Sequence, residues 1–144
     1  MIANALLGAS FLSMLGAFGA QPAFAAAGCG DSSRRVIDPD VPGVVQRTRT
    51  CTVYRPTFIF LEPITAQPTG SLTAGRHWFI CQRRGGDNPS VQQRSGRVAR
   101  NNWWLRTLGD RGGWGWAPAT HVSGGQDFEA VPGLPNCAQG PFRA

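Results

Sequence analysis

Hydrophobic and polar residues alternate in short runs between residues 53 and 123, and Gly or Pro separates one run from the next. Short runs that are rich in β-branched and aromatic residues are typical of strands joined by turns. They predict strands near residues 57–61, 70–72, 76–82, 102–107 and 113–117, with one helical or 3₁₀ turn at residues 118–121. The pattern therefore predicts an all-β fold, in which residues 53–123 form a small antiparallel barrel.

Three segments outside these runs lack the alternation. Residues 26–52 contain Pro39 and Pro42, which fix φ and remove backbone donors, so we expect a Pro-rich extended arm there. Residues 83–102 are polar and contain five Arg against one Asp, and we expect a mobile basic loop outside the barrel. Residues 124–144 are rich in Gly and Pro and predict an irregular tail.

The first residues have the composition of a targeting segment. Residues 2–20 are uncharged and almost entirely apolar or small, and Ala23-Phe24-Ala25 is typical of a cleavage site. We predict a signal peptide over residues 1–25, secretion of the remaining chain and no stable membrane insertion after cleavage. Two alternatives stay open, namely an uncleaved membrane anchor and a lipoprotein that is lipidated at Cys29.

Four cysteines follow the predicted cleavage site, at positions 29, 51, 81 and 137. An even number in an exported chain predicts two disulfides, and four cysteines allow three pairings. Cys29 and Cys51 flank the arm, and the tail that contains Cys137 has no strand partner to hold it. We therefore predict the pairs Cys29–Cys51 and Cys81–Cys137. The cysteine spacings match no zinc motif, and we expect no metal or other cofactor.

The composition disfavours several kinds of catalysis. The chain of 144 residues contains 14 Arg and no Lys, so lysine nucleophiles, Schiff bases and P-loops are excluded. There are only two His residues, and no GxSxG, SxxK or HExxH motif is present. We expect a protein that is not an enzyme. The net charge of +6 favours anionic partners, and export separates the protein from nucleic acid.

All five Trp residues fall in predicted strands. Trp103 and Trp104 are neighbours, so a strand turns them to opposite faces, and they cannot share one small core. At least one Trp is then either exposed or covered by the arm or the basic loop. An exposed Trp can stack on a sugar ring or a Pro-rich peptide, while Arg attracts an acidic polymer. The candidate ligand-binding residues are Trp78, Trp103, Trp104, Trp114, Trp116, Arg94, Arg97 and Arg100.

Residues 72–75, 78–82, 103–107 and 112–122 together resemble a bacterial SH3-type domain, most clearly in the run GWAPATHV at residues 115–122. The ending VPGLPNC at residues 131–137 is similar to the tails of small exported SH3-like proteins of actinobacteria. This resemblance implies a non-catalytic binding module for cell-wall peptide, cell-wall glycan or another cell-surface ligand. The alternative is an exported protein that binds a protein partner, such as a protease inhibitor. We expect a monomer.

Overall fold

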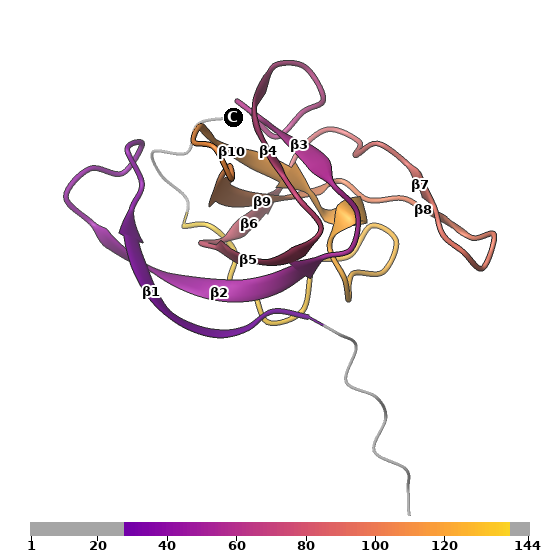
Figure 1. Ribbon diagram of the computed structural model, residues 1–144, viewed down its shortest axis with the longest axis horizontal. Helices are drawn as coiled ribbons and strands as arrows, with labels where there is room; N and C mark the ends of the chain where they lie inside the picture. The colour runs from indigo at the N-terminus through magenta and orange to yellow at the C-terminus, as the bar shows by residue number, and fades with distance from the viewer. Residues whose placement is uncertain (1–27, 139–144) are drawn as a thin grey trace, which may run out of the picture.

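The computed structural model describes residues 28–138, which form an all-β fold built from antiparallel sheets, as predicted (Figure 1). The signal peptide predicted over residues 1–25 and the last residues of the tail, 139–144, lie outside the described residues. Among residues 28–138, no helix is long and apolar enough to cross a membrane.

All five predicted strands are present, four of them in the main, five-stranded sheet, but the strand predicted over residues 76–82 ends at Phe79 and a separate strand begins at Gln82. They are β3 (Thr57–Phe60), β4 (Pro68–Leu72), β5 (Gly75–Phe79), β9 (Trp103–Leu108) and β10 (Trp114–Pro118). The 3₁₀ turn η1 (Ala119–His121) follows β10, which confirms the predicted turn. Four of these strands join β6 (Gln82–Arg84) in a five-stranded sheet of order β4-β3-β10-β9-β6.

The segment that we expected to be an arm forms a β-hairpin instead. β1 (Gly30–Ile37) pairs with β2 (Val45–Val53), and β2 pairs with β5, which gives a second sheet of order β1-β2-β5. The buried residues of β2 are Thr48, Cys51 and Val53, of which only Val53 is aliphatic. Because the strand signal depends on alternating large apolar residues, the sequence pattern did not indicate this hairpin.

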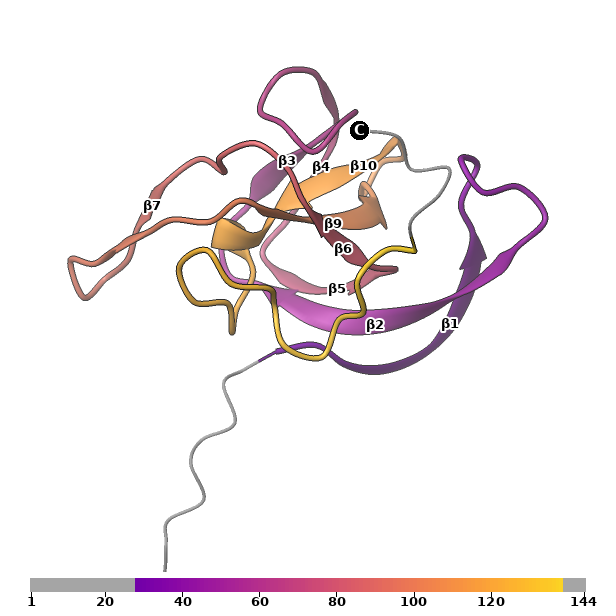
Figure 2. The ribbon, with the colours of Figure 1, turned by 180° about the vertical axis from the view of Figure 1, so that it is seen from behind.

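The basic segment at residues 83–102 is also more ordered than a long loop. It contains the end of β6 and a second hairpin, β7 (Val91–Gln92) with β8 (Val98–Ala99). Four of its side chains are buried, those of Asn88, Val91, Ala99 and Asn101. The hairpin does project from the sheets, as expected, on the side of the molecule opposite the β1–β2 hairpin (Figures 1 and 2).

The interior consists of two hydrophobic clusters, one on each face of the main sheet. The larger cluster includes Ile59, Phe79 and Leu105, and the half-buried Trp103 packs against it. The smaller cluster consists of Phe60, Trp104 and Trp116. Trp103 and Trp104 therefore contact different clusters, which confirms the prediction that they face opposite ways.

Both predicted disulfides are present, and the second attaches the tail to the main sheet. The bonded pairs are Cys29–Cys51 and Cys81–Cys137, with Cα atoms 4.2 and 4.9 Å apart. Gln82, next to Cys81, is buried, and its side-chain amide donates to the carbonyls of Val131 and Leu134. Its side-chain oxygen accepts from the Val131 N–H at 2.8 Å. The tail is therefore hydrogen-bonded to β6 as well as cross-linked to it.

A buried ion pair joins the β1–β2 hairpin to the main sheet. Asp38, just after β1, is 0% exposed, and both its oxygens accept from the Arg106 guanidinium of β9, at 2.7 and 2.8 Å. Asp40 accepts from the same guanidinium at 2.9 Å. The ring centroids of Trp114 and Trp116 each lie 5.5 Å from Arg106 Cζ. The hairpin turn is thus held by a fully desolvated, bidentate contact.

The variant Asp38→Ala removes the fully buried carboxylate that accepts two hydrogen bonds from the buried Arg106 guanidinium. Removing one partner of a buried pair costs about 3–5 kcal/mol, so we expect a decrease of that size in the free energy of unfolding. Urea unfolding followed by Trp fluorescence measures it. Asp31→Ala is the matched control, because the Asp31–Arg49 pair is exposed to solvent and should contribute little. Equal effects of the two substitutions would contradict this prediction.

Candidate functional site

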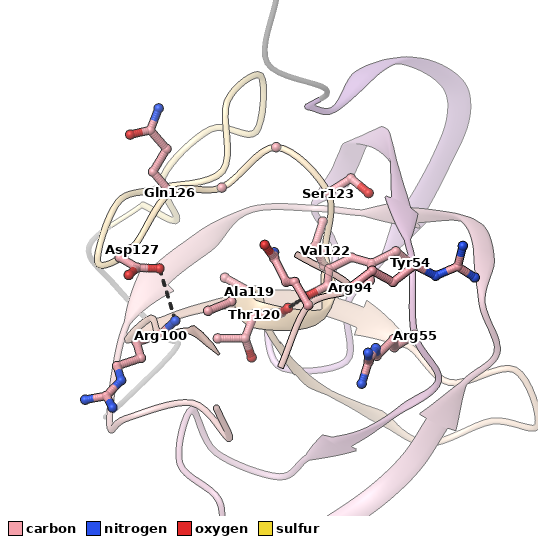
Figure 3. Close-up of a pocket in the computed structure, with 14 residues that line it drawn as sticks. Tyr54, Arg55, Arg94, Arg100, Ala119, Thr120, Val122, Ser123, Gln126 and Asp127 are labelled. Atoms are coloured by element: carbon pink, nitrogen blue, oxygen red, sulfur yellow. Dashed lines mark hydrogen bonds between the residues drawn. The ribbon is translucent and has the colours of Figure 1, made fainter. Parts of the chain in front are cut away.

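A cleft with a volume of about 690 Å³ lies at the base of the β7–β8 hairpin (Figure 3). It lies between this hairpin, the corner after β2, the turn η1 and the first residues of the tail. The residues that line it are mainly polar. They are Tyr54, Arg55, Gln93, Arg94, Ala99, Arg100, Ala119, Thr120, Val122, Ser123, Gly124, Gly125, Gln126 and Asp127.

The charge of the cleft is positive. Arg55, Arg94 and Arg100 line it, and the single acidic residue that lines it is Asp127. The Asp127 carboxylate accepts from the Arg97 guanidinium at 2.6 Å and from the Arg100 backbone N–H at 3.1 Å, so its charge is already compensated. The three lining guanidinium groups lie at separate places on the rim rather than together (Figure 3). This arrangement attracts anions along the length of the cleft.

The floor of the cleft is fixed by hydrogen bonds. The Tyr54 hydroxyl donates to the Thr120 carbonyl, and the Thr120 hydroxyl donates to the Pro89 carbonyl at 2.8 Å. The Asn88 side-chain oxygen accepts from the Thr120 N–H at 3.1 Å. Residues of the basic segment are therefore bonded directly to η1, which gives the cleft a preformed base.

The tail closes one side of the cleft with a turn at residues 123–127. Gly124 has a φ of 98°, a left-handed conformation that Gly adopts without steric cost. The buried Asn101 side chain donates to the carbonyls of Gln126 and Glu129, at 3.1 and 3.0 Å. The turn is thus attached to the segment between β8 and β9.

Phe128, which follows this turn, has an unusual backbone conformation. Its φ is 58°, and among residues 28–138 it is the one residue other than Gly with a positive φ. A left-handed conformation costs a bulky residue about 1–3 kcal/mol. The hydrogen bond from its N–H to the Arg100 carbonyl, at 3.1 Å, holds this conformation. The Phe128 side chain is nevertheless 50% exposed.

The structure does not place the candidate Trp residues at this cleft, because none of them lines it. Trp104 and Trp116 are buried, while Trp78, Trp103 and Trp114 are half-buried. Arginines contact most of the rings: Arg34 lies over Trp78, Arg84 over Trp103 and Arg83 over Trp116, at 5.3 to 5.7 Å. Of the predicted arginines, Arg94 and Arg100 line the cleft, and Arg97 reaches it through Asp127.

Trp78 lines a second cavity, of about 550 Å³, on the side of the β1–β2 hairpin. Asp110 and His77 also line it, with 3.3 Å between the Asp110 carboxylate and His77 Nδ1. Slight burial raises the pKa of Asp110, but hydrogen bonds from Thr73 and the nearby His77 outweigh burial and lower it overall. Asp110 and His77 are thus partners, and the other charged residues that line this cavity are Arg34, which lies over Trp78, and Arg76, compared with three arginines at the basic cleft.

Sequence reasoning missed the part of the cleft that lies outside the basic segment. Tyr54 and Arg55 stand between two strands, and the turn at residues 123–127 lies in the tail. The available signals were a single Tyr beside Arg and a Gly-Gly pair followed by polar residues. Neither signal indicates a site unless the fold brings the two segments together.

Comparison with known proteins finds no family model, curated protein or solved structure that matches the chain. Its SH3-like family therefore stays a prediction. In the part of the chain that the structure describes, no three His, Cys, Asp or Glu side chains come together as a metal site.

His121 lies beneath the cleft, where burial lowers its pKa and the nearby Arg55 guanidinium lowers it further. Below about pH 6.5, the usual pKa of His, the unfolded chain binds a proton at position 121 that the folded chain does not. We therefore expect the free energy of unfolding to decrease as the pH falls from about 7.5 to about 5.5.

Urea unfolding at the two pH values tests this expectation. His121→Gln should lose less stability over the same range, because Gln does not titrate. Arg55→Gln should reduce the pH dependence in part, because it removes only the smaller of the two causes. A His121→Gln variant that loses as much stability as the wild type would show that another group is responsible.

Proposed function

We propose that the protein is a secreted, non-catalytic binding module whose basic cleft binds an anionic polymer of the cell surface. The observation that carries this proposal is the charge of the rim. Arg55, Arg94 and Arg100 surround a preformed cleft, and the acid among them, Asp127, is already paired with Arg97. Such a surface concentrates negatively charged ligands at the cleft.

The spacing of the arginines favours a polymer over a small anion. A compact anion is held best where several donors converge on it. Here Arg94 and Arg100 extend toward different ends of the cleft (Figure 3). A chain with repeated negative charges can contact both, whereas a single small anion contacts one at a time.

Export is supported by the two disulfides, because disulfides persist in oxidising compartments such as the cell exterior. The predicted signal peptide at residues 1–25 points in the same direction. A protein that meets its ligand outside the cell encounters the acidic polymers of the wall before any nucleic acid.

Binding of the purified protein to isolated bacterial cell walls tests the proposal. At low salt we expect saturable binding, and at about 1 M salt we expect it to fall steeply, because the Debye length is then about 3 Å. The double variant Arg94→Ser/Arg100→Ser should bind about tenfold more weakly. Its melting temperature should stay near that of the wild type, because both side chains are exposed.

The control is Arg35→Ser/Arg47→Ser, which removes the same net charge from the opposite side of the molecule. Arg35 and Arg47 face each other across the β1–β2 hairpin, and both are exposed. Equal losses in the two double variants would assign binding to net charge rather than to the cleft. Absence of binding to any wall preparation at low salt would overturn the proposal and favour a protein partner, such as a protease.

A further inference from the structure

Phe128 occupies a position where neither the backbone nor the core requires an aromatic residue. Gly or Asn would adopt its φ of 58° more readily, and half of its side chain is exposed to solvent. A bulky residue that is both strained and exposed suggests a role in binding rather than in stability.

The surroundings hold this strained residue firmly. The preceding residue, Asp127, is bonded to Arg97 and to the Arg100 backbone. The Phe128 N–H donates to the Arg100 carbonyl, and Asn101 bonds the carbonyls on both sides of Phe128, those of Gln126 and Glu129. Five hydrogen bonds thus hold the chain around Phe128, which directly follows the cleft-lining Asp127.

The polar groups next to Phe128 restrict the kind of ligand. Arg100, whose carbonyl is bonded to the Phe128 N–H, supplies a cation at the rim of the cleft. Asp127 and Glu129 are the sequence neighbours of Phe128. Insertion of the Phe128 ring into a lipid bilayer would therefore remove water from two carboxylates, which is costly. A water-soluble chain of sugar rings leaves both carboxylates hydrated, and the pairing of Asp127 with Arg97 limits the repulsion that its acidic groups meet beside the ring.

We propose that the ligand of the basic cleft is an acidic glycan, in which a sugar ring stacks on Phe128 while the acidic groups of the chain pair with Arg100 and Arg94. The C–H groups on the face of a pyranose ring pack against an aromatic ring, whose face carries partial negative charge. This inference rests on the proposed function, since it names the class of polymer that the cleft binds.

Two polyanions separate the ring contact from the charge contact. Polygalacturonate carries one carboxylate on each sugar ring, and linear polyphosphate carries repeated charges without rings. Isothermal titration at low salt measures the affinity of each for the wild type and for Phe128→Gly. We expect the substitution to weaken polygalacturonate binding about fivefold or more and to change polyphosphate binding less than about twofold. The melting temperature should equal or exceed that of the wild type, because Gly relieves the strained φ.

Two further variants complete the experiment. Phe128→Tyr keeps the ring and should retain polygalacturonate binding. Phe58→Ser removes another exposed Phe, which lies on β3 rather than next to the turn at residues 123–127, and should leave binding to both polymers unchanged.

The possible failures are distinguishable. If the wild type binds both polymers and Phe128→Gly weakens neither, or weakens both equally, the glycan inference is overturned while the cleft keeps its proposed role. A marked decrease in the melting temperature of Phe128→Gly would also overturn it, because the ring would then be structural. If the wild type binds neither polymer at low salt, the proposed function itself fails.

Discussion

The bond between Asp38 and Arg106 connects the turn of the β1–β2 hairpin to the main sheet. Asp38 belongs to this turn, Arg106 belongs to β9, and the rings of Trp114 and Trp116 on the paired strand β10 lie near the guanidinium. The turn of the hairpin is otherwise mainly exposed, with Val44 and Val45 facing solvent. A buried ion pair contributes little more to the free energy of unfolding than an apolar contact of the same size would. It does restrict the conformation of the hairpin turn, because burying either charge without its partner is costly.

The same pairing of Arg with aromatic rings recurs across the surface. Four of the five Trp rings have an arginine guanidinium over them, and the fifth, Trp104, donates its Nε1–H to the Gly86 carbonyl and packs edge-on against Phe60. The stacked arginines cover aromatic surface that a small core cannot enclose. Arginines are therefore used in two ways, some covering Trp rings and others lining the cleft, and the Trp residues are absent from the cleft for that reason.

The sequence predicted those parts of the fold whose stability comes from alternating large apolar residues. The strands around Trp78, Trp103 and Trp116 were evident for that reason, and the disulfides followed from the position of the cysteines between them. The β1–β2 hairpin was not evident, because its buried residues are Thr48, Cys51, Val53 and the Asp38 of one ion pair, which do not form an alternation of large apolar residues. The cleft could be predicted only in part. Arg94 and Arg100 were conspicuous in a basic segment, whereas Arg55 and the turn after Val122 become neighbours only in three dimensions. The strained φ of Phe128 has no signature in the sequence.

The positions of the two disulfides determine how the domain transmits force. A pull on the chain before Cys29 passes through sulfur to Cys51 on β2, the central strand of its sheet, and so bypasses the edge strand β1. A pull on the chain after Cys137 enters at Cys81, next to the buried Gln82. The load between the two ends therefore falls on the pairing of β2 with β5, in which Cys51 lies opposite His77, and on the large cluster beneath it. The β7–β8 hairpin and the turn after η1 lie in the loop closed by Cys81–Cys137 and so outside this path, whereas Tyr54 and Arg55, between Cys51 and Cys81, connect the cleft to it.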